Sequence, residues 1–264
     1  MAICTKLNLK SMKIHRYVII ISFALFLGAF SSAFAQNTRS FFSVTGGYSL
    51  PVGDIAREKL NDPLAGLAGS GYFGQANYDF RFARWLGIRL SGSLNVNTTN
   101  SGPIIDKANS YVAVLNKNYE WDSQVSQWKL GAGLIGPAIY LNMNRVQLEA
   151  HLQGGIVRAS TPSVYLVGHE VGTNGEVVEG SQAIDVSLNH VTVNPYAFGA
   201  GLSLRLPLFG KLFFQLNGDV IGAKAEVKDL AIKAKIGTLE LSDQISDKRF
   251  IGVVNIGAGL GIAF

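Results

Sequence analysis

Cysteine is almost absent from this chain of 264 residues, because the only one is Cys4. It lies in an N-terminal segment that has a basic start, an apolar run over 17–30 and the small-residue ending Ala33-Phe34-Ala35. This is the layout of a secretory signal peptide, so we expect 1–35 to be a cleaved signal peptide and 36–264 to be the mature domain. A mature chain without cysteine has no disulfide framework, no thiolate nucleophile and no thiolate metal site.

The mature chain also lacks an excess of positive or negative charge. The leader holds four basic residues and no acidic ones, which leaves 19 Lys and Arg against 18 Asp and Glu and a net charge near +1. The sequence pI of about 9.3 is therefore mostly a property of the leader. A balance of this kind favours neither a nucleic-acid partner nor polybasic binding to a membrane surface.

Long hydrophobic runs are lacking after Gln36, and the sequence predicts no transmembrane helix. Hydrophobic residues still make up 48% of the chain and charged residues only 16%. Alternation accounts for this composition, because apolar residues alternate with polar or small ones in eight segments, as β-strands with one apolar face do. The segments are 85–96, 145–156, 211–222 and 250–264, and more loosely 42–50, 72–80, 128–136 and 196–206.

The connections between these segments alternate strictly between short and long. The short ones fall at 82–83, 142–144 and 208–210, and the long ones at 51–70, 97–125, 158–191 and 224–248. The predicted fold is therefore all-β, an eight-stranded antiparallel up-and-down transmembrane β-barrel with four long extracellular loops and three short periplasmic turns. Because the apolar residues fall mainly on even positions, we expect even side chains to face lipid and odd side chains to face a closed lumen.

Charged side chains are predicted to line this lumen. An eight-stranded barrel is just wide enough for side chains to fill it, and an unpaired buried charge costs several kcal/mol, so we expect the charges to pair across the interior. A structural polar core is the favoured interpretation, and a gated ion or proton path is the alternative. The predicted inward set is Asp79, Arg81, Arg89, Lys129, Glu149, His151, Arg205 and Asp219.

Glycines and aromatic residues carry two further expectations. Gly-Ala-Gly-Leu recurs at 131–134, 199–202 and 257–260, with a looser copy at 69–72, and these glycines are predicted to face the lumen. Aromatic residues are predicted to form two girdles at the membrane interfaces. Those near the short turns are Phe80, Trp85 and Tyr140, and those near the long loops are Tyr48, Tyr72 and Trp128.

No catalytic, cofactor-binding or metal site is predicted. Glu149 and His151 share one strand face, which suits a metal or an acid–base pair, but no cysteine or second nearby histidine completes a ligand set. Ser163, His169 and Glu170 lie in one long loop and leave open a lipid-modifying hydrolase, although no motif connects them. A non-enzymatic role is therefore favoured.

The signal peptide, the eight alternating segments and the terminal Phe264 together resemble the small outer-membrane β-barrel family, which includes the OmpA transmembrane domain. The resemblance implies a location in the outer membrane, contact with its lipid and lipopolysaccharide, and help from periplasmic chaperones. It also implies that Phe264 is a C-terminal signal for the barrel-assembly machinery.

The favoured function is a structural or surface-interaction role in which the long loops contact an unknown extracellular partner. One alternative is a narrow gated pore, and another is the lipid-modifying enzyme. A third is a secreted barrel that encloses a lipophilic ligand, which would reverse the two faces of every strand.

Overall fold

The computed structural model describes residues 39–58, 66–112, 117–144 and 146–264, so the expected signal peptide lies outside the described residues. None of the helices in this part of the chain is long and apolar enough to cross a membrane. The elements in chain order are β1 (Ser40–Gly53), η1 (Asp54–Ala56), β2 (Ala68–Arg81), β3 (Leu86–Thr99), α2 (Gly102–Val112), β4 (Asn118–Val125), β5 (Trp128–Met143), β6 (Val146–Ser160), β7 (Val164–Val171), β8 (Ile184–Leu188), β9 (Thr192–Val193), β10 (Tyr196–Pro207), β11 (Leu212–Ile236) and β12 (Leu239–Ala263).

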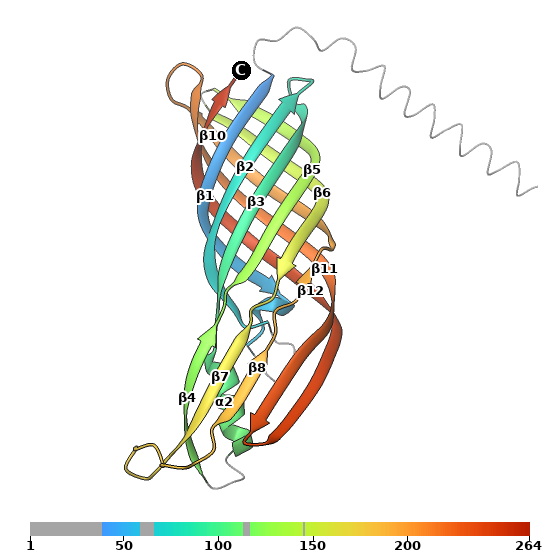
Figure 1. Ribbon diagram of the computed structural model, residues 1–264. Helices are drawn as coiled ribbons and strands as arrows, with labels where there is room; N and C mark the ends of the chain where they lie inside the picture. The colour runs from blue at the N-terminus through green and yellow to red at the C-terminus, as the bar shows by residue number, and fades with distance from the viewer. Residues whose placement is uncertain (1–38, 59–65, 113–116, 145) are drawn as a thin grey trace, which may run out of the picture.

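Eight of the strands close into an antiparallel barrel (Figure 1). They pair in the order β1-β2-β3-β5-β6-β10-β11-β12, and β12 pairs with β1 to complete the ring. The expected eight-stranded up-and-down barrel is thereby confirmed.

The ring closes next to the short turns. Ser40 and Phe264 exchange two backbone hydrogen bonds of 3.0 and 2.9 Å. The end of the chain lies beside the β10–β11 turn, where the backbone N–H of Ala263 donates to the carbonyl of Lys211 at 2.9 Å (Figure 1). At the β5–β6 and β10–β11 turns, Asn144 and Gly210 adopt φ values of 50° and 58°. Both residue types tolerate this left-handed conformation, which lets the chain reverse within a few residues.

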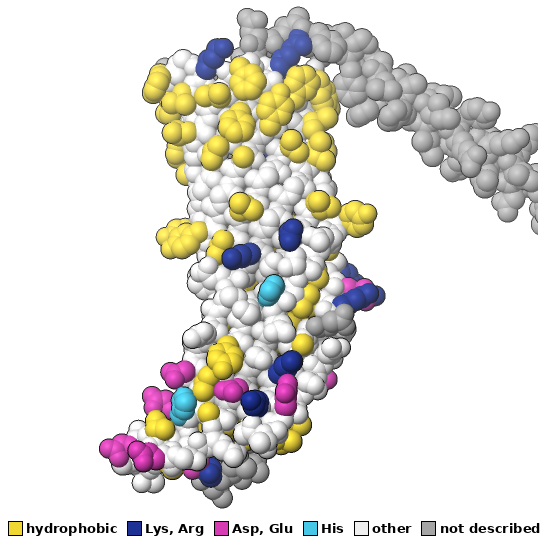
Figure 2. All heavy atoms as spheres, viewed as in Figure 1, with side chains coloured by type: hydrophobic (Ala, Val, Ile, Leu, Met, Phe, Trp, Pro, Cys, Tyr) yellow, Lys and Arg dark blue, Asp and Glu magenta, His cyan; other side chains and the backbone are white. Residues whose placement is uncertain are grey.

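Side chains alternate between the lumen and the outer surface as expected in seven of the barrel strands, where odd positions face inward. The exposed large side chains of the barrel strands are mainly leucine, isoleucine, valine and aromatic residues. On the face seen in Figure 2 they gather most densely over the part of the barrel nearer the short turns. An outer surface of this kind contradicts the alternative of a soluble lipid-binding barrel, which would carry its apolar residues inside.

In β5 the expected assignment of faces is wrong. This strand pairs odd residues with even ones on both sides, as in Val96 with Lys129 and Tyr140 with Glu149. Because strand side chains have a period of two, an offset of one residue exchanges the two faces. Even positions of β5 therefore face the lumen, and Gly131 and Gly133 lie on the outer surface rather than inside.

The segments expected to be long loops contain regular structure beyond one end of the barrel. We call this region the extension, which consists of α2, β4, β7, β8 and the distal part of the β11–β12 hairpin, residues 228–248. Its strands form a sheet in the order β4-β7-β8-β11-β12, which continues directly from the barrel through the two long strands (Figure 1). The hairpin ends in a turn at Gly237, where φ is 59°.

Candidate functional site

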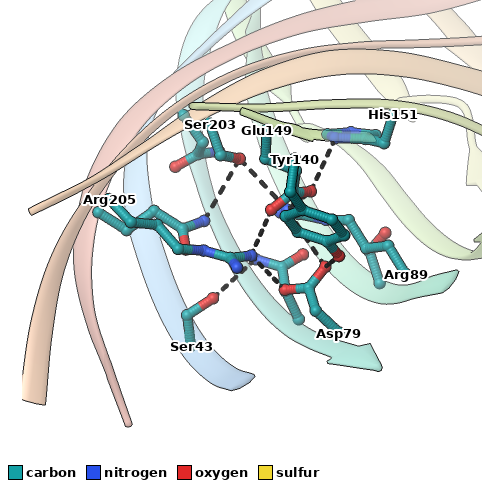
Figure 3. A network of polar contacts seen from close by, with 12 residues as sticks. Ser43, Asp79, Arg89, Tyr140, Glu149, His151, Ser203 and Arg205 are labelled. Carbon is teal, nitrogen blue, oxygen red and sulfur yellow. Dashed lines mark hydrogen bonds and ion pairs between the residues drawn. The ribbon is translucent and has the colours of Figure 1, made fainter. Parts of the chain in front are cut away.

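The structure brings six of the predicted charged residues together inside the barrel, and all of them except Asp219 are labelled in Figure 3. They come from five strands, and each is at most 5% exposed. The six are Asp79 on β2, Arg89 on β3, Glu149 and His151 on β6, Arg205 on β10 and Asp219 on β11.

Two arginines and two carboxylates form the centre of this network. Arg89 donates to Glu149, and Arg205 donates to both Asp79 and Glu149, so Glu149 binds an arginine through each of its oxygens. Arg205 also donates to Gln147 and Gln215, and Arg89 to the hydroxyl of Ser203. Charge-assisted bonds of this kind offset the cost of moving the ions out of water.

His151 extends the network toward the extension. Its Nδ1 lies 3.3 Å from Oε1 of Glu149, and its Nε2 lies 3.0 Å from Oδ1 of Asp219. A neutral imidazole has only one N–H, whereas an imidazolium has two, so two carboxylate neighbours suit the protonated ring. With His151 protonated, the three cations of the network balance its three carboxylates.

Tyr140 is a member of this site that sequence reasoning missed. It was expected in the interfacial girdle, but the face exchange in β5 buries it in the lumen, where its hydroxyl donates to Asp79 at 3.2 Å. Nothing in the residue types signals this position, because it depends on the register between β5 and its neighbours.

The same exchange of faces in β5 places Lys129 and Trp128 on the opposite sides of the barrel wall from those expected. The expectation that Lys129 faces the lumen is wrong, since its side chain is exposed on the outer surface. Trp128, expected at the outer interface, is buried inside instead and donates from Nε1 to the carbonyl of Gly66 at 2.7 Å.

Aromatic rings and arginines close the lumen at the short-turn end. The guanidinium carbons of Arg81 and Arg205 each lie 4.7 Å from the centre of the Phe41 ring, and Arg205 also lies 5.5 Å from the centre of the Phe213 ring. Desolvated cation–π contacts of this kind are attractive, so the two arginines and the rings hold one another in place.

At the opposite end of the lumen, a cluster of buried apolar side chains forms what we call the apolar plug. Between the plug and the charged network lies a cavity of about 10 Å³, bordered by Gln75, Ser93 and His151 among others, with room for about one water molecule. The plug consists of Ile55, Ala68, Trp128, Leu130, Leu134, Val157, Ala159, Ala197, Ile221, Ala223, Ala225, Ile251 and Val253. The described lumen is therefore filled from end to end by aromatic, charged and apolar layers.

The extension sheet has one apolar face. Ile184, Val186 and Leu188 of β8 pair with apolar residues of β11 on one side, and Val186 and Leu188 pair with Leu166 and Val164 of β7 on the other. Directly paired residues share a face, so these side chains form one apolar surface.

Helix α2 lies at the β4 end of the apolar face. The Trp121 ring lies over Gly168, and its Nε1 donates to Asn109 of α2 at 2.7 Å. At the other end, Leu239 and Leu241 of the β11–β12 hairpin are 57% and 58% exposed.

The polar residues considered for hydrolase chemistry are separated in the extension. Ser163 precedes β7 and bonds to Ser126, whereas His169 lies six residues further on, about 20 Å along an extended strand, and faces Asp122 at 3.8 Å. Glu170 binds Lys117 at 2.7 Å, a hydrogen bond that raises the pKa of the lysine. The structure therefore does not assemble these residues into one catalytic group.

Metal binding has no geometric basis in the described part of the chain, where no three His, Cys, Asp or Glu side chains are grouped to hold an ion. Glu149 and His151, considered together for a metal or for acid–base chemistry, are occupied by the ion pairs of the lumen.

No family model matches the chain, and no curated protein sequence matches it. Among the solved structures that are similar to this chain are the following three. Neisserial surface protein A has 10% identity and a TM-score of 0.42, and the match covers 85% of this chain and 97% of that one. The attachment invasion locus protein Ail of Yersinia pestis has 13% identity and a TM-score of 0.40, with 86% and 100% covered. The outer membrane protein OprG of Pseudomonas aeruginosa has 13% identity and a TM-score of 0.40, with 86% and 97% covered.

Similarities at this level say nothing about activity, so the class of the chain follows from its own geometry. A closed antiparallel ring, an outer surface of apolar side chains and a lumen sealed by paired charges define an outer-membrane β-barrel protein. Within that class it is a filled barrel that carries a folded sheet at one end.

Proposed function

We propose that this protein is a membrane anchor that presents the extension outside the cell as an interaction surface. The observation that carries the proposal is the contrast between a filled lumen and an ordered extension. Paired charges and the apolar plug leave the barrel interior without an open path, whereas the extension holds an exposed apolar tip at Leu239 and Leu241. Function on a rigid scaffold usually resides in the segments that the scaffold displays.

The orientation follows from the two ends of the barrel. In bacterial outer-membrane barrels the short turns face the periplasm and the long connections face the outside. Here the short turns and the closure between Ser40 and Phe264 lie together at one end, and the extension lies at the other. The extension end is therefore assigned to the cell exterior, and Phe264 to the side from which the barrel-assembly machinery would bind it.

Cysteine labelling of intact cells tests this assignment, because Cys4 lies in the expected leader. Leu239→Cys places a thiol at the exposed tip of the extension, and Phe209→Cys places one in the exposed β10–β11 turn as the matched control. A membrane-impermeant maleimide should label the Leu239→Cys variant in intact cells and the Phe209→Cys variant only after permeabilisation. The reverse pattern would contradict the proposal.

A conductance measurement tests the anchor role separately. Purified protein in a planar bilayer should give no steady ion current, because the lumen is occupied by side chains that bind one another. A steady current would instead support the narrow pore and would require the charged network to rearrange.

A further inference from the structure

A row of three polar side chains inside the barrel carries oxygen atoms that lack a partner. Thr45 of β1, Gln75 of β2 and Ser93 of β3 are directly paired neighbours on the lumen side of the wall, and each is at most 5% exposed. Thr45 Oγ1, Gln75 Oε1 and Ser93 Oγ have no hydrogen-bond partner among the described residues. Buried polar atoms in native proteins are almost always paired, so these three oxygens require an explanation.

Two of the three side chains border the cavity between the charged network and the apolar plug. Gln75 and Ser93 line it from β2 and β3. His151 of β6 and Asp219 of β11 line the same cavity, whereas Thr45 is not among the lining residues. Room for a guest and unpaired oxygens therefore coincide at Gln75 and Ser93.

The hydrogen bonds of Gln75 fix which of its atoms is left over. Its Nε2 donates to Oδ1 of Asn77 at 2.7 Å and to Oδ2 of Asp219 at 3.2 Å, so both N–H groups of the amide are used. Rotating the amide by half a turn would bring its oxygen against those two acceptors. The Oε1 of Gln75 therefore keeps its place and needs a donor from another source.

Asp219 also has an acceptor position left. Its Oδ2 accepts from Gln75 and, at 2.7 Å, from Nδ2 of Asn217, and its Oδ1 lies 3.0 Å from Nε2 of His151. A carboxylate oxygen accepts two hydrogen bonds, so Oδ1 has room for a second donor. Because the hydroxyl of Ser93 either donates or accepts, a guest in the cavity meets two acceptors and one hydroxyl.

Water matches this set in size and in chemistry. The cavity of about 10 Å³ has room for about one water molecule, and buried waters typically make about three hydrogen bonds. A water that donates to Gln75 and Asp219 and accepts from Ser93 uses all three groups. A metal cation fits less well, because the three cations and three carboxylates of the network already balance with His151 protonated. One more charge in the lumen would lack a counter-ion.

We propose that this cavity is a binding site for one resident water molecule, which donates to Gln75 Oε1 and Asp219 Oδ1 and accepts from Ser93 Oγ. The water joins β2 and β3 to β11 across the lumen, beside the charged network. It is a structural ligand of the sealed barrel and is independent of the partner proposed for the extension.

A crystal structure of the protein purified from outer membranes tests the site directly. We expect one isolated density peak in the cavity, about 2.7–3.0 Å from each of the three oxygens, as hydrogen bonds require. A cavity without density would overturn the proposal. A peak with markedly shorter contacts to all three oxygens would also overturn it, because it would assign a metal cation to the cavity.

Two substitutions test the same site by the sign of their effect. Ser93→Ala and Thr45→Val each remove one hydroxyl that has no partner among the described residues, but only Ser93 borders the cavity. If the water is present, Ser93→Ala removes one of its ligands, and the equilibrium constant for unfolding should rise roughly threefold to tenfold. Thr45→Val exchanges an unpaired hydroxyl for a methyl group and should lower this constant or leave it within about twofold.

Urea titration of protein folded into lipid vesicles measures both constants. A Ser93→Ala variant that is as stable as the parent protein, or more stable, would overturn the proposal, since an unbound hydroxyl costs stability and its removal restores it. Heat-modifiable gel mobility reports folding of both variants, and the crystal structure of the unsubstituted protein decides the question even if neither variant folds.

Discussion

The barrel and the extension share two strands but solve the problem of sheet edges in opposite ways. In the barrel, the pairing of β10 with β11 and of β12 with β1 leaves none of the eight strands with a free edge. In the extension, β4 and the distal part of β12 are the two outer strands of the described sheet. A closed ring protects its backbone from other chains, whereas an open sheet offers its edges to them.

The two regions also differ in what they bury. The middle of β11 buries the polar residues Gln215, Asn217 and Asp219 in the lumen, the plug residues Ile221, Ala223 and Ala225 follow on the same face, and Leu230 is buried in the extension. The pairing of β11 with β12 shifts between Val227 and Leu230, and this irregularity moves the buried positions from odd to even numbers. The surrounding medium therefore decides which face of one continuous strand turns inward, and the bulge makes the change possible.

The largest effect is expected from breaking the barrel interior with Arg205→Ala. Because Asp79 and Glu149 would lose a buried ionic partner, the free energy of unfolding should fall by about 3–5 kcal/mol. Urea titration of protein folded into lipid vesicles measures the change, and Arg84→Ala at an exposed turn is the control. A loss below about 1 kcal/mol would mean that the network does not hold the barrel together.

A smaller and local effect is expected from Leu166→Ala in the extension. Leu166 is fully buried on the apolar face, and its truncation should lower the local stability of the sheet by about 3 kcal/mol. Hydrogen exchange should show faster exchange in β7 and β8 and unchanged protection in the barrel strands. An equal loss of protection in the barrel would show that the two regions unfold as one unit.

The smallest effect is expected from Glu240→Gln at the hairpin. Its carboxylate lies 3.7 Å from the ammonium of Lys233, and both side chains are more than half exposed. Pairs of this kind contribute roughly 0–1 kcal/mol, so the stability of the protein should hardly change. If Glu240→Gln lowered the stability of the extension more than Leu166→Ala does, surface contacts would contribute more to this region than buried ones, contrary to the prediction.

Most of the barrel could be predicted from the sequence because its outer surface must be continuously apolar. That requirement imposes a period of two on each strand, and the short turns at 82–83, 142–144 and 208–210 fix the connectivity. The charged residues of odd-numbered positions then fall inside together. Six of the eight charged residues assigned to the lumen meet in one network for this reason, and Arg81 contacts the rings at its end.

The face of β5 could not be predicted in the same way. Its sequence alternates weakly, because Gly131 and Gly133 place no side chain on the outer surface, and the pattern alone does not say which parity faces lipid. The register with β3 and β6 decides it. The expected positions of Lys129, Trp128 and Tyr140 are all wrong for this single reason.

The sequence does indicate part of the apolar plug, but not through the alternation of apolar and polar residues. Over 220–223 and 251–254 apolar or small residues occupy both parities, which indicates strands that are buried on both faces. The extension was harder to foresee, because β7 and β8 are short and pair with residues far away in the chain. Strands of this kind are defined by their partners more than by their own composition.

Asp54 lies at the boundary between the barrel and the extension. Its carboxylate accepts a 2.8 Å hydrogen bond from the backbone N–H of Phe250, next to the point where β1 stops pairing with β12. The side chain thus takes a bond that a further strand residue would otherwise make. As a result, the part of the β11–β12 hairpin beyond this bond can change its length or sequence without changing the pairing of β1 with β12. The displayed surface can then diversify while the part within the lipid stays constant.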